Sequence, residues 1–233
     1  MKTTQLGVEM ARQIPPLRYL DNAEQNTEIF HWLAKRNLDT SFTIQGETVY
    51  RSVINNKNYE FFCLDFENRK VLYFSQLSVS DNRCFLHDSL RKNRQSYVWA
   101  DALFRMKHRG FARQCLWELL FPLVPNILIS DREQTNHGYN FWEILVQEAI
   151  IQNYCVIAFI CKPQIPRKRY FTKIMTIADI EYHAEELKKL LFGKETEYQN
   201  RGFAVCKKDI ASLLEKDAKV TELTLDEFLK LDI

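Results

Sequence analysis

The stretch KHRGFAR, residues 107–113, gathers residue types that suit the binding of a phosphate group. Gly110 has no side chain to hold an anion away from the backbone, and Ala112 has nearly none. Apolar residues at helical spacing begin at Phe111, so we expect a helix that starts at this glycine. The first N–H groups of a helix have no partner inside it and lie at the positive end of its dipole. The surrounding positive charge comes from Lys107, His108, Arg109 and Arg113.

Two interpretations of this turn stay open on the pattern alone. It is either a pyrophosphate site or an ordinary strand–turn–helix junction, because glycine and lysine are common at such junctions. The letters RGFA recur at residues 201–204, where we expect only a turn. The polar run KETEYQN precedes that second copy, and we expect the next helix to start later, near residues 207–209.

The elements that must position the first turn alternate between strand and helix patterns. Strand patterns occupy residues 48–54, 59–66, 70–79, 97–104, 126–131 and 154–160. Helical patterns occupy 22–37 with Asn22 as cap, a stretch from Gly110 that Pro122 and Pro125 stop, and 139–153. The first two strands flank NNKN, a hairpin signal, and the polar, basic segment 87–96 precedes the fourth strand as a loop. The order predicts an α/β (α+β) fold in which an antiparallel meander leads into a βαβαβ segment, and therefore a mixed sheet flanked by helices.

The character of the chain changes after Ile160. The run CKPQIPRKRYF has two prolines and a basic cluster, which is typical of a connector. Amphipathic helical patterns dominate beyond it. We therefore expect a domain over residues 1–161 and a mostly helical C-terminal appendage over 162–233. Three roles for the appendage stay open: closing over a site, forming a homodimer, or covering an apolar sheet face.

The order of elements around the first RGFA resembles that of the GNAT superfamily of N-acetyltransferases. The family's signature, Gln/Arg-x-x-Gly-x-Gly/Ala, lies between the fourth strand and the next helix, and KHRGFA fits it at Gly110 and Ala112. Lys107 stands where the signature has Gln or Arg, a departure that keeps a donor and a positive charge. The stretches NILISD and REQTNHGYNFWEILVQEAI resemble the family's fifth strand and following helix. The resemblance covers roughly residues 20–160.

The resemblance implies that the chain binds acetyl-CoA or another acyl-CoA as co-substrate and transfers the acyl group to an amine. It implies that the pyrophosphate sits on the turn His108–Arg113, with Lys107 beside it. It also implies that the pantetheine arm makes sheet-like bonds to the end of the fourth strand, at Leu103, Phe104 and Arg105. Two roles stay open for the polar residues before the helix at 139–153, namely further contacts to pantetheine or substrate, or capping of that helix: Asp131, Gln134, Thr135 and Asn136.

Two residues are candidates for proton transfer. Asp101 lies in the apolar strand pattern YVWADALF, where partial burial would raise the pKa of its carboxyl and suit it to act as a general base. A structural ion pair with Arg105 or an arginine of RKNR is the competing interpretation. The resemblance implies a tyrosine acid for the leaving thiolate in the helix after the fifth strand. Trp142 holds the matching position, so Tyr139, one turn earlier, is the candidate in its place.

Composition limits the other classes of function. The chain of 233 residues has 32 basic and 30 acidic residues, so its net charge gives no argument for nucleic acid or an anionic membrane as partner. It has no apolar run long enough for a membrane span and no secretion-signal pattern at its N-terminus, so we expect a cytoplasmic protein. Six cysteines show no C-x-x-C spacing and no histidine pair shows metal spacing, so we expect no metal.

Three functions remain open from the sequence. The first is an acyl-CoA-dependent N-acyltransferase that acts on a small molecule, a protein or an aminoacyl-tRNA. The second is a catalytically degenerate GNAT-like module that binds or regulates a protein or nucleic-acid partner. The third is a nucleic-acid-binding protein that uses the basic runs at residues 91–94 and 167–169, although a solvated surface is the usual explanation of such runs.

Overall fold

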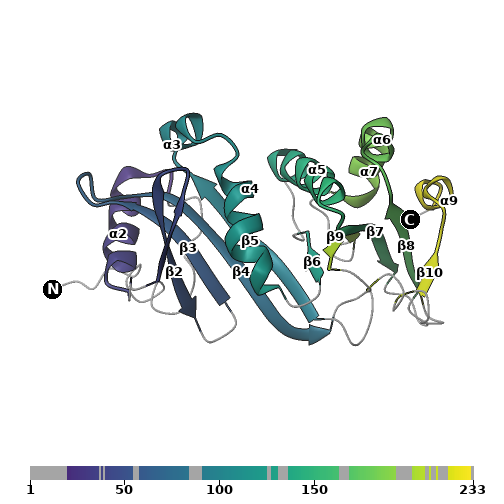
Figure 1. Cartoon of the computed structure of the whole chain (residues 1–233), viewed down its shortest axis with the longest axis horizontal. Helices are drawn as coiled ribbons and strands as arrows, with labels where there is room; N and C mark the ends of the chain where they lie inside the picture. Colours follow the sequence, from purple (N-terminus) through teal and green to yellow (C-terminus); the bar gives the residue numbers. More distant parts are fainter. Residues whose placement is uncertain are drawn as a thin grey trace. The chain divides into compact units, whose positions relative to one another are not determined.

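Two compact units make up the chain, and each is described by itself. Unit 1 comprises Met1–Leu77 and Ser96–Leu116, and unit 2 comprises Ser78–Gln95 and Trp117–Ile233. The computed structural model describes residues 20–36, 38, 40–54, 58–83, 91–124, 127–130, 136–162, 168–192, 201–207, 210, 214 and 220–231. Both units combine helices with mostly antiparallel strands, so the predicted mixed α/β class is confirmed (Figure 1).

Unit 1 is built on an antiparallel meander. Its elements are α2 (Ala23–Ala34), β1 (Ser41–Ile44), β2 (Glu47–Ile54), β3 (Asn58–Asp65), part of β4 (Lys70–Arg83), the end of β5 (Arg91–Ala100), α3 (Ala102–Lys107) and α4 (Phe111–Cys115). The strands lie in the order β1-β2-β3-β4-β5. The hairpin predicted on either side of NNKN is confirmed. It consists of β2 and β3, with Ser52 opposite Glu60 and Tyr50 opposite Phe62. A further strand, β1, pairs with β2 through a two-residue turn at Gln45 and Gly46, where both φ angles are positive as a type I′ hairpin turn requires.

Helices cover the two faces of the unit 1 sheet. Helix α2 begins after Asn22, whose side chain accepts from the Gln25 N–H as expected of a cap. Its apolar side packs on Phe62 and Phe74 through residues that include Ile29 and Leu33. Tyr73, which directly precedes Phe74 in β4, packs against Phe111 of α4, with ring centroids 5.0 Å apart. Because neighbouring strand residues point to opposite faces, α2 and α4 lie on opposite sides of β4.

The buried Asn26 joins α2 to strand β4. Its Oδ1 accepts from the Val71 N–H at 2.7 Å, while its Nδ2 donates to the carbonyls of Val71 at 3.3 Å and Leu20 at 3.0 Å. A buried amide is stable only when its polar atoms are paired, so these bonds fix the position of the helix along the strand.

Unit 2 carries the second part of the sheet. Its elements are β6 (Ile127–Ile129), α5 (Asn136–Ile151), β7 (Cys155–Lys162), β8 (Lys168–Ile174), α6 (Ile177–Tyr182), α7 (Ala184–Leu191), β9 (Arg201–Cys206), β10 (Val220–Glu222) and α9 (Leu225–Leu229). The strand order is β5-β6-β9-β7-β8-β10. Strand β5 is parallel to β6, with Asn93 opposite Leu128, whereas β9 is antiparallel to both β6 and β7. Strands β6 and β7 therefore run the same way, as the βαβ pattern predicts, but β9 lies between them.

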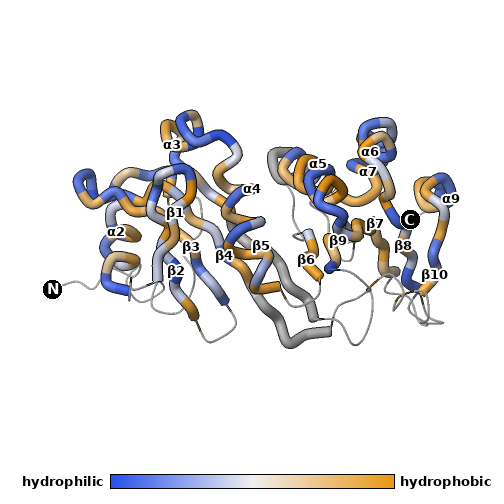
Figure 2. The backbone as a smooth tube through the Cα atoms, in the orientation of Figure 1, coloured by the Kyte–Doolittle hydropathy of each residue, from blue (hydrophilic) through white to orange (hydrophobic). Residues whose placement is uncertain are grey.

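The second RGFA forms this inserted strand, so our prediction of a turn there is wrong. All six residues of β9 are buried, and Figure 2 shows the apolar character that β9 shares with β6 and β7. Because every residue of β9 is buried, both of its faces are covered. The strand therefore lacks the alternation of polar and apolar residues by which half-buried strands are recognised. Its glycine has a structural reason: Gly202 has φ +150°, and a Cβ there would overlap the Oγ of Ser130.

The C-terminal part of the chain is more than the helical appendage that we expected. Beyond residue 162 it supplies strands β8, β9 and β10 as well as α6, α7 and α9. The expected boundary at residues 161 and 162 also falls inside β7, since that strand ends at Lys162. Predicted helices at 110–121 and 139–153 are confirmed. The first continues from α4 through a π-helical turn at Leu116–Leu120 and a 3₁₀ turn at Phe121–Leu123. Among the described helices, none has the length and apolar character needed to cross a membrane.

We predict that Gly202→Ala lowers the free energy of unfolding by about 2–4 kcal/mol, because the new methyl group meets Ser130 and the backbone leaves its favoured region. Denaturant titration measures the change. The matched control is Gly46→Ala, also at positive φ but with nothing within 4 Å of the added Cβ, which we expect to cost about 1 kcal/mol. Adding Ser130→Gly to Gly202→Ala should restore part of the loss, and strictly additive effects would contradict the steric explanation.

Candidate functional site

The predicted fourth strand, β5 in the structure, begins and ends earlier than expected. It starts at Arg91, inside the segment 87–96 where we expected a loop, and it stops at Ala100. Helix α3 then begins at Ala102 with Asp101 as its N-cap. Asp101 therefore does not lie in the middle of an apolar strand. Its own N–H donates to the Leu72 carbonyl at 2.9 Å, and its Oδ1 accepts from the N–H groups of Leu103 and Phe104. A capping carboxylate explains this residue without a role in proton transfer.

The residues expected to bind pantetheine lie in α3 and not at the end of a strand. Leu103 and Phe104 donate their backbone N–H groups to the Asp101 side chain, and Arg105 donates its N–H to the Asp101 carbonyl at 2.8 Å. These groups cannot also make sheet-like bonds to a ligand. The ladder between β5 and β6 joins Asn93 to Leu128 and Arg94 to Ile129, and the residues at the end of β5, before Asp101, lie beyond it.

The basic turn therefore joins two short helices. Helix α3 ends at Lys107, and α4 begins at Phe111 with Gly110 in the left-handed conformation at φ +76°. The side chain of Gln45, from the β1–β2 turn, holds this junction from outside. Its Nε2 donates to the Arg109 carbonyl at 3.3 Å and to Gln114 Oε1 at 3.1 Å. The glycine is required by the backbone angle, which a residue with a Cβ adopts only with strain.

Two of the four expected basic side chains share a single carboxylate. Lys107 Nζ lies 3.2 Å from Glu47 Oε1, and His108 Nε2 lies 2.8 Å from the same atom, although not in hydrogen-bond alignment. His108 is buried and its ring lies against Phe104, with centroids 4.6 Å apart, and near Phe111 at 5.9 Å. Sequence reasoning did not anticipate Glu47, which is 60 residues away in the chain and removes part of the positive charge assigned to this turn.

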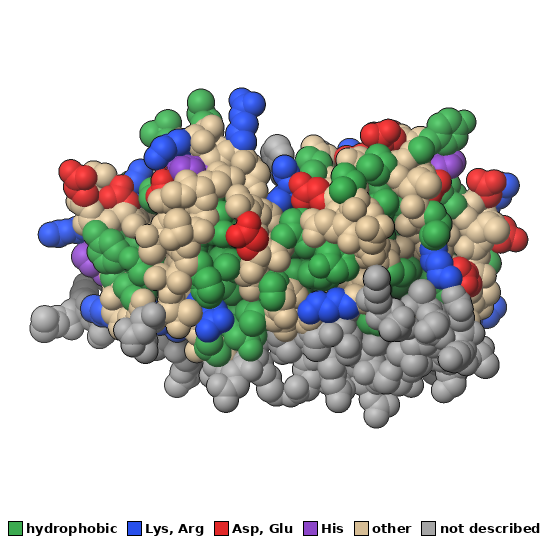
Figure 3. All heavy atoms as spheres, in the orientation of Figure 1, with side chains coloured by type: hydrophobic (Ala, Val, Ile, Leu, Met, Phe, Trp, Pro, Cys, Tyr) green, Lys and Arg blue, Asp and Glu red, His purple; other side chains and the backbone are tan. Residues whose placement is uncertain are grey.

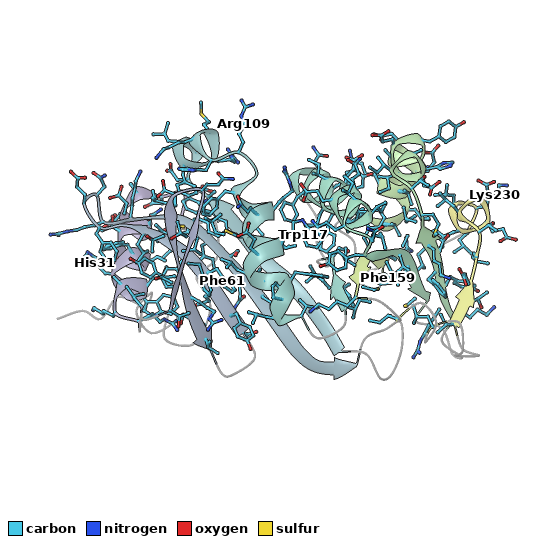
Figure 4. The ribbon with its side chains drawn as sticks, in the orientation of Figure 1. His31, Phe61, Arg109, Trp117, Phe159 and Lys230 are labelled. Carbon is cyan, nitrogen blue, oxygen red and sulfur yellow. The ribbon has the colours of Figure 1, made fainter. Side chains whose placement is uncertain are left out.

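The remaining positive charge lies on the exposed side of the turn. Arg109 is exposed, and Figure 4 shows it at the junction of α3 and α4. The guanidinium of Arg113 lies close over Gly110, since a Cβ built on that glycine would come 3.3 Å from its Nη2. Leu103 and Met106 are 71% and 73% exposed on α3, so hydrophobic and basic side chains stand together there (Figure 3).

The candidate acid Tyr139 connects two helices of unit 2. Its hydroxyl donates to the Ala184 carbonyl at 2.8 Å, and its ring meets Phe192. Burial and the nearby Glu143 and Glu185 raise the pKa of this phenol well above its usual value. A phenol that is tied to a carbonyl and holds its proton this strongly is a poor match to proton delivery at neutral pH. Trp142 is also buried in the core.

Of the four polar residues at or before the start of α5 that are candidates for contacts to pantetheine or substrate, the structure describes only the backbone of one. Asp131, Gln134 and Thr135 lie outside the described residues. Asn136 begins α5, but its side chain is outside the described part.

A second polar cluster, which the sequence patterns did not reveal, lies on the α2 face of the unit 1 sheet. Glu60 and Gln76 are fully buried, and among the described residues neither side chain has a hydrogen-bond partner for its two polar atoms. Both lie two residues along their strands from Phe62 and Phe74, which face α2, so alternation points them to the same face. The sequence signal is slight: Glu60 is the only charged residue in the run NYEFFCL and breaks its apolar pattern.

Arg36 stands at the edge of this cluster but does not neutralise it. Its Nη1 lies 3.7 Å from Glu60 Oε2 and 3.4 Å from Ser52 Oγ, and its guanidinium lies 4.0 Å from the centre of the Trp32 ring. Burial outweighs the attraction of Arg36 and raises the pKa of the Glu60 carboxyl to about 7. A carboxyl that is half ionised near neutral pH can take up and release protons, which is a property of functional acids and bases.

No family model, curated protein or solved structure matches this chain. Within the described residues, no three or more His, Cys, Asp or Glu side chains are grouped so as to hold a metal ion. Two features of unit 1 are therefore the candidates for function: the basic α3–α4 turn and the buried Glu60 cluster.

We predict that Asp101→Asn leaves the free energy of unfolding nearly unchanged, because an asparagine oxygen can accept the same two N–H groups, and that Asp101→Ala costs about 1–2 kcal/mol. Denaturant titration of the two variants distinguishes them. Equal losses would show that the charge of Asp101, and not its capping oxygen, matters at this position.

We also predict a pH dependence from Glu60. Its pKa is about 7 in the folded protein against an ordinary 4.5, so the folded state holds the proton more tightly. The stability that this proton contributes is complete below pH 4.5 and is lost as the pH rises through 7. Relative to Glu60→Gln, the wild type should lose about 3 kcal/mol over this range. Unfolding titrations between pH 5 and about 8 measure it, and the exposed Glu28→Gln serves as control, with a constant difference expected.

Proposed function

We propose that this chain binds an acyl-CoA and transfers its acyl group to an amine, in the manner of the GNAT superfamily. The observation that carries the proposal is the parallel pair β5 and β6 within a mostly antiparallel sheet, with the α3–α4 segment between them and the meander β2–β5 before them. This is the order of elements on which the resemblance rests. The corrections above change where β5 begins and ends, but they leave the order of the meander, the α3–α4 segment, β6 and α5 as predicted.

The α3–α4 turn is the proposed site of the pyrophosphate. Gly110 has no Cβ to shield the backbone, and the start of α4 directs N–H groups toward its N-terminal side, with the Phe111 N–H already bonded to the His108 carbonyl. Arg109 stands exposed beside the glycine and can form charge-assisted hydrogen bonds with phosphate oxygens, while the guanidinium of Arg113 lies over the glycine and adds positive charge. In this proposal the pantetheine arm pairs with the backbone at the end of β5, which takes over the role first assigned to Leu103–Arg105.

The proposed reaction needs few groups from the protein. The nitrogen lone pair of the amine attacks the thioester carbonyl carbon, a C–N bond forms, the C–S bond breaks and the sulfur leaves as a thiolate. The nitrogen gives up a proton to a base, and the thiolate takes one from solvent. The chain contributes by holding the two reactants in line and by accepting the proton.

A binding module that has lost catalysis is the second candidate. It is favoured by the state of Tyr139, whose hydroxyl is engaged by Ala184, and by the tryptophan in the core at position 142. In that case α5 has no tyrosine that could act as the acid that the resemblance implies for the leaving thiolate. Binding of acyl-CoA is common to both candidates, and turnover separates them.

We predict that CoA and acetyl-CoA raise the melting temperature of the protein and that Arg109→Gln weakens their binding about tenfold, the loss expected for one charge-assisted bond to phosphate. Calorimetric titration gives the affinity. Lys35→Gln, which removes an exposed positive charge at the end of α2, is the matched control and should bind as the wild type does.

No stabilisation at millimolar CoA would rule out both candidates. If CoA binds, release of free thiol from acetyl-CoA in the presence of a panel of primary amines tests turnover. Binding without any amine-dependent thiol release would favour the module over the enzyme.

A further inference from the structure

The buried polar cluster of unit 1 consists of Glu60, Gln76, Ser52 and Arg36. Ser52 lies directly opposite Glu60 in the β2–β3 ladder, and Gln76 reaches the same face from β4. Phe62 and Phe74 of the apolar cluster under α2 lie two residues along the same strands. An unpaired amide in such surroundings costs about 1–3 kcal/mol, and an unpaired carboxylate costs more. Within the described part of the chain, four polar atoms of two fully buried side chains have no hydrogen-bond partner, so a bound partner would stabilise them.

The atoms of the cluster define what that partner must offer. Both oxygens of Glu60 and the Oε1 of Gln76 are acceptors without a donor among the described residues, and the Nε2 of Gln76 is a donor without an acceptor there. Arg36, at the edge of the cluster, lies 3.7 Å from Glu60 and also approaches Ser52 and Trp32. The unpartnered atoms are therefore three acceptors against one amide donor group, and the site carries a negative charge when Glu60 is ionised. An anion would be repelled, and a single carboxylate is a weak site for a divalent cation.

The three acceptors match one kind of cation. A primary ammonium group has three N–H donors in a compact charge, which matches three acceptors on Glu60 and Gln76.

We propose that the Glu60–Gln76 cluster is a binding site for the primary ammonium group of a slender alkylamine. The ammonium nitrogen donates to the two oxygens of Glu60 and to Oε1 of Gln76. This site does not rest on the proposed function, because it lies on the α2 face of the sheet, whereas α4 packs on the opposite face.

The position of the cluster sets the shape of the amine. Only two residue pairs, Val53 with Tyr59 and Ile54 with Asn58, separate Glu60 from the end of the β2–β3 ladder. Yet Glu60 and Gln76 have no exposed surface, so the ligand must enter by a small displacement of the packing above them. Partly buried aromatic side chains that pack on the apolar cluster under α2, on the same face of the sheet, can line an alkyl chain: Trp32, Tyr50 and Trp99. A branched or quaternary ammonium is too wide for such a site and has fewer N–H groups to offer.

The test is calorimetric titration of the full chain with n-butylammonium chloride at pH 8, where the Glu60 carboxyl is ionised. We expect saturable binding, at least a tenfold weaker affinity in Glu60→Gln and in Gln76→Leu, and no change in Glu28→Gln. Tetramethylammonium and potassium chloride should not bind or compete. Circular dichroism of each variant checks that it is folded, and Glu60→Gln keeps the size of the side chain so that packing is preserved.

Equal affinity of the wild type and Glu60→Gln, or no saturable binding of butylammonium, would overturn the proposal and leave ordered water as the partner of these atoms. Because the titration contains no CoA, its outcome is independent of the proposed function. Amine binding without CoA binding would support the site and reject acyl transfer, whereas CoA binding without amine binding would reject the site and leave the proposed function to the turnover test.

Discussion

The cap that Asp101 places on α3 determines the geometry of the basic turn. Its N–H donates to the carbonyl of Leu72 in the neighbouring strand, its side chain accepts from the N–H groups of Leu103 and Phe104, and its carbonyl accepts from the N–H of Arg105. One residue thus ends a strand and begins a helix. The α3 helix, in turn, delivers His108 to the space between Phe104 and Glu47, so that Gly110 lies at a junction of two helices. The same side chain cannot serve as a free base while it caps a helix.

The buried side chains of unit 1 show how polar groups in a core are tolerated or left unsatisfied. Asn26 has its amide fully engaged with β4 and Leu20, which makes it part of the structure. Glu60 and Gln76 are equally buried but lack such bonds among the described residues. Asn26 is therefore a structural polar residue, whereas Glu60 and Gln76 are candidates for binding a ligand. They lie on the α2 face of the sheet, away from the basic turn.

The secondary structure was predicted best where the periodicity of the sequence and the burial of the chain agree. Helices α2 and α5, the hairpin of β2 and β3, and the buried strand β6 follow directly from local patterns. The end of β5 was misplaced because ALF continues its apolar run, and only the capping bonds of Asp101 show that these residues turn into a helix. The second RGFA was misread because β9 gains its strand conformation from pairing with β6 and β7.

The sequence by itself determined the class of fold, the order of the elements and the helix that begins beyond Gly110, since these depend on local spacing of apolar residues and on turn residues. It could not determine that Glu47 would neutralise part of the basic turn, that Tyr139 would be tied to α7, or that Glu60 and Gln76 would share one buried face. Those facts depend on contacts between residues far apart in the chain. Such contacts arise only when strands pair and helices pack, so the tertiary structure alone decided them.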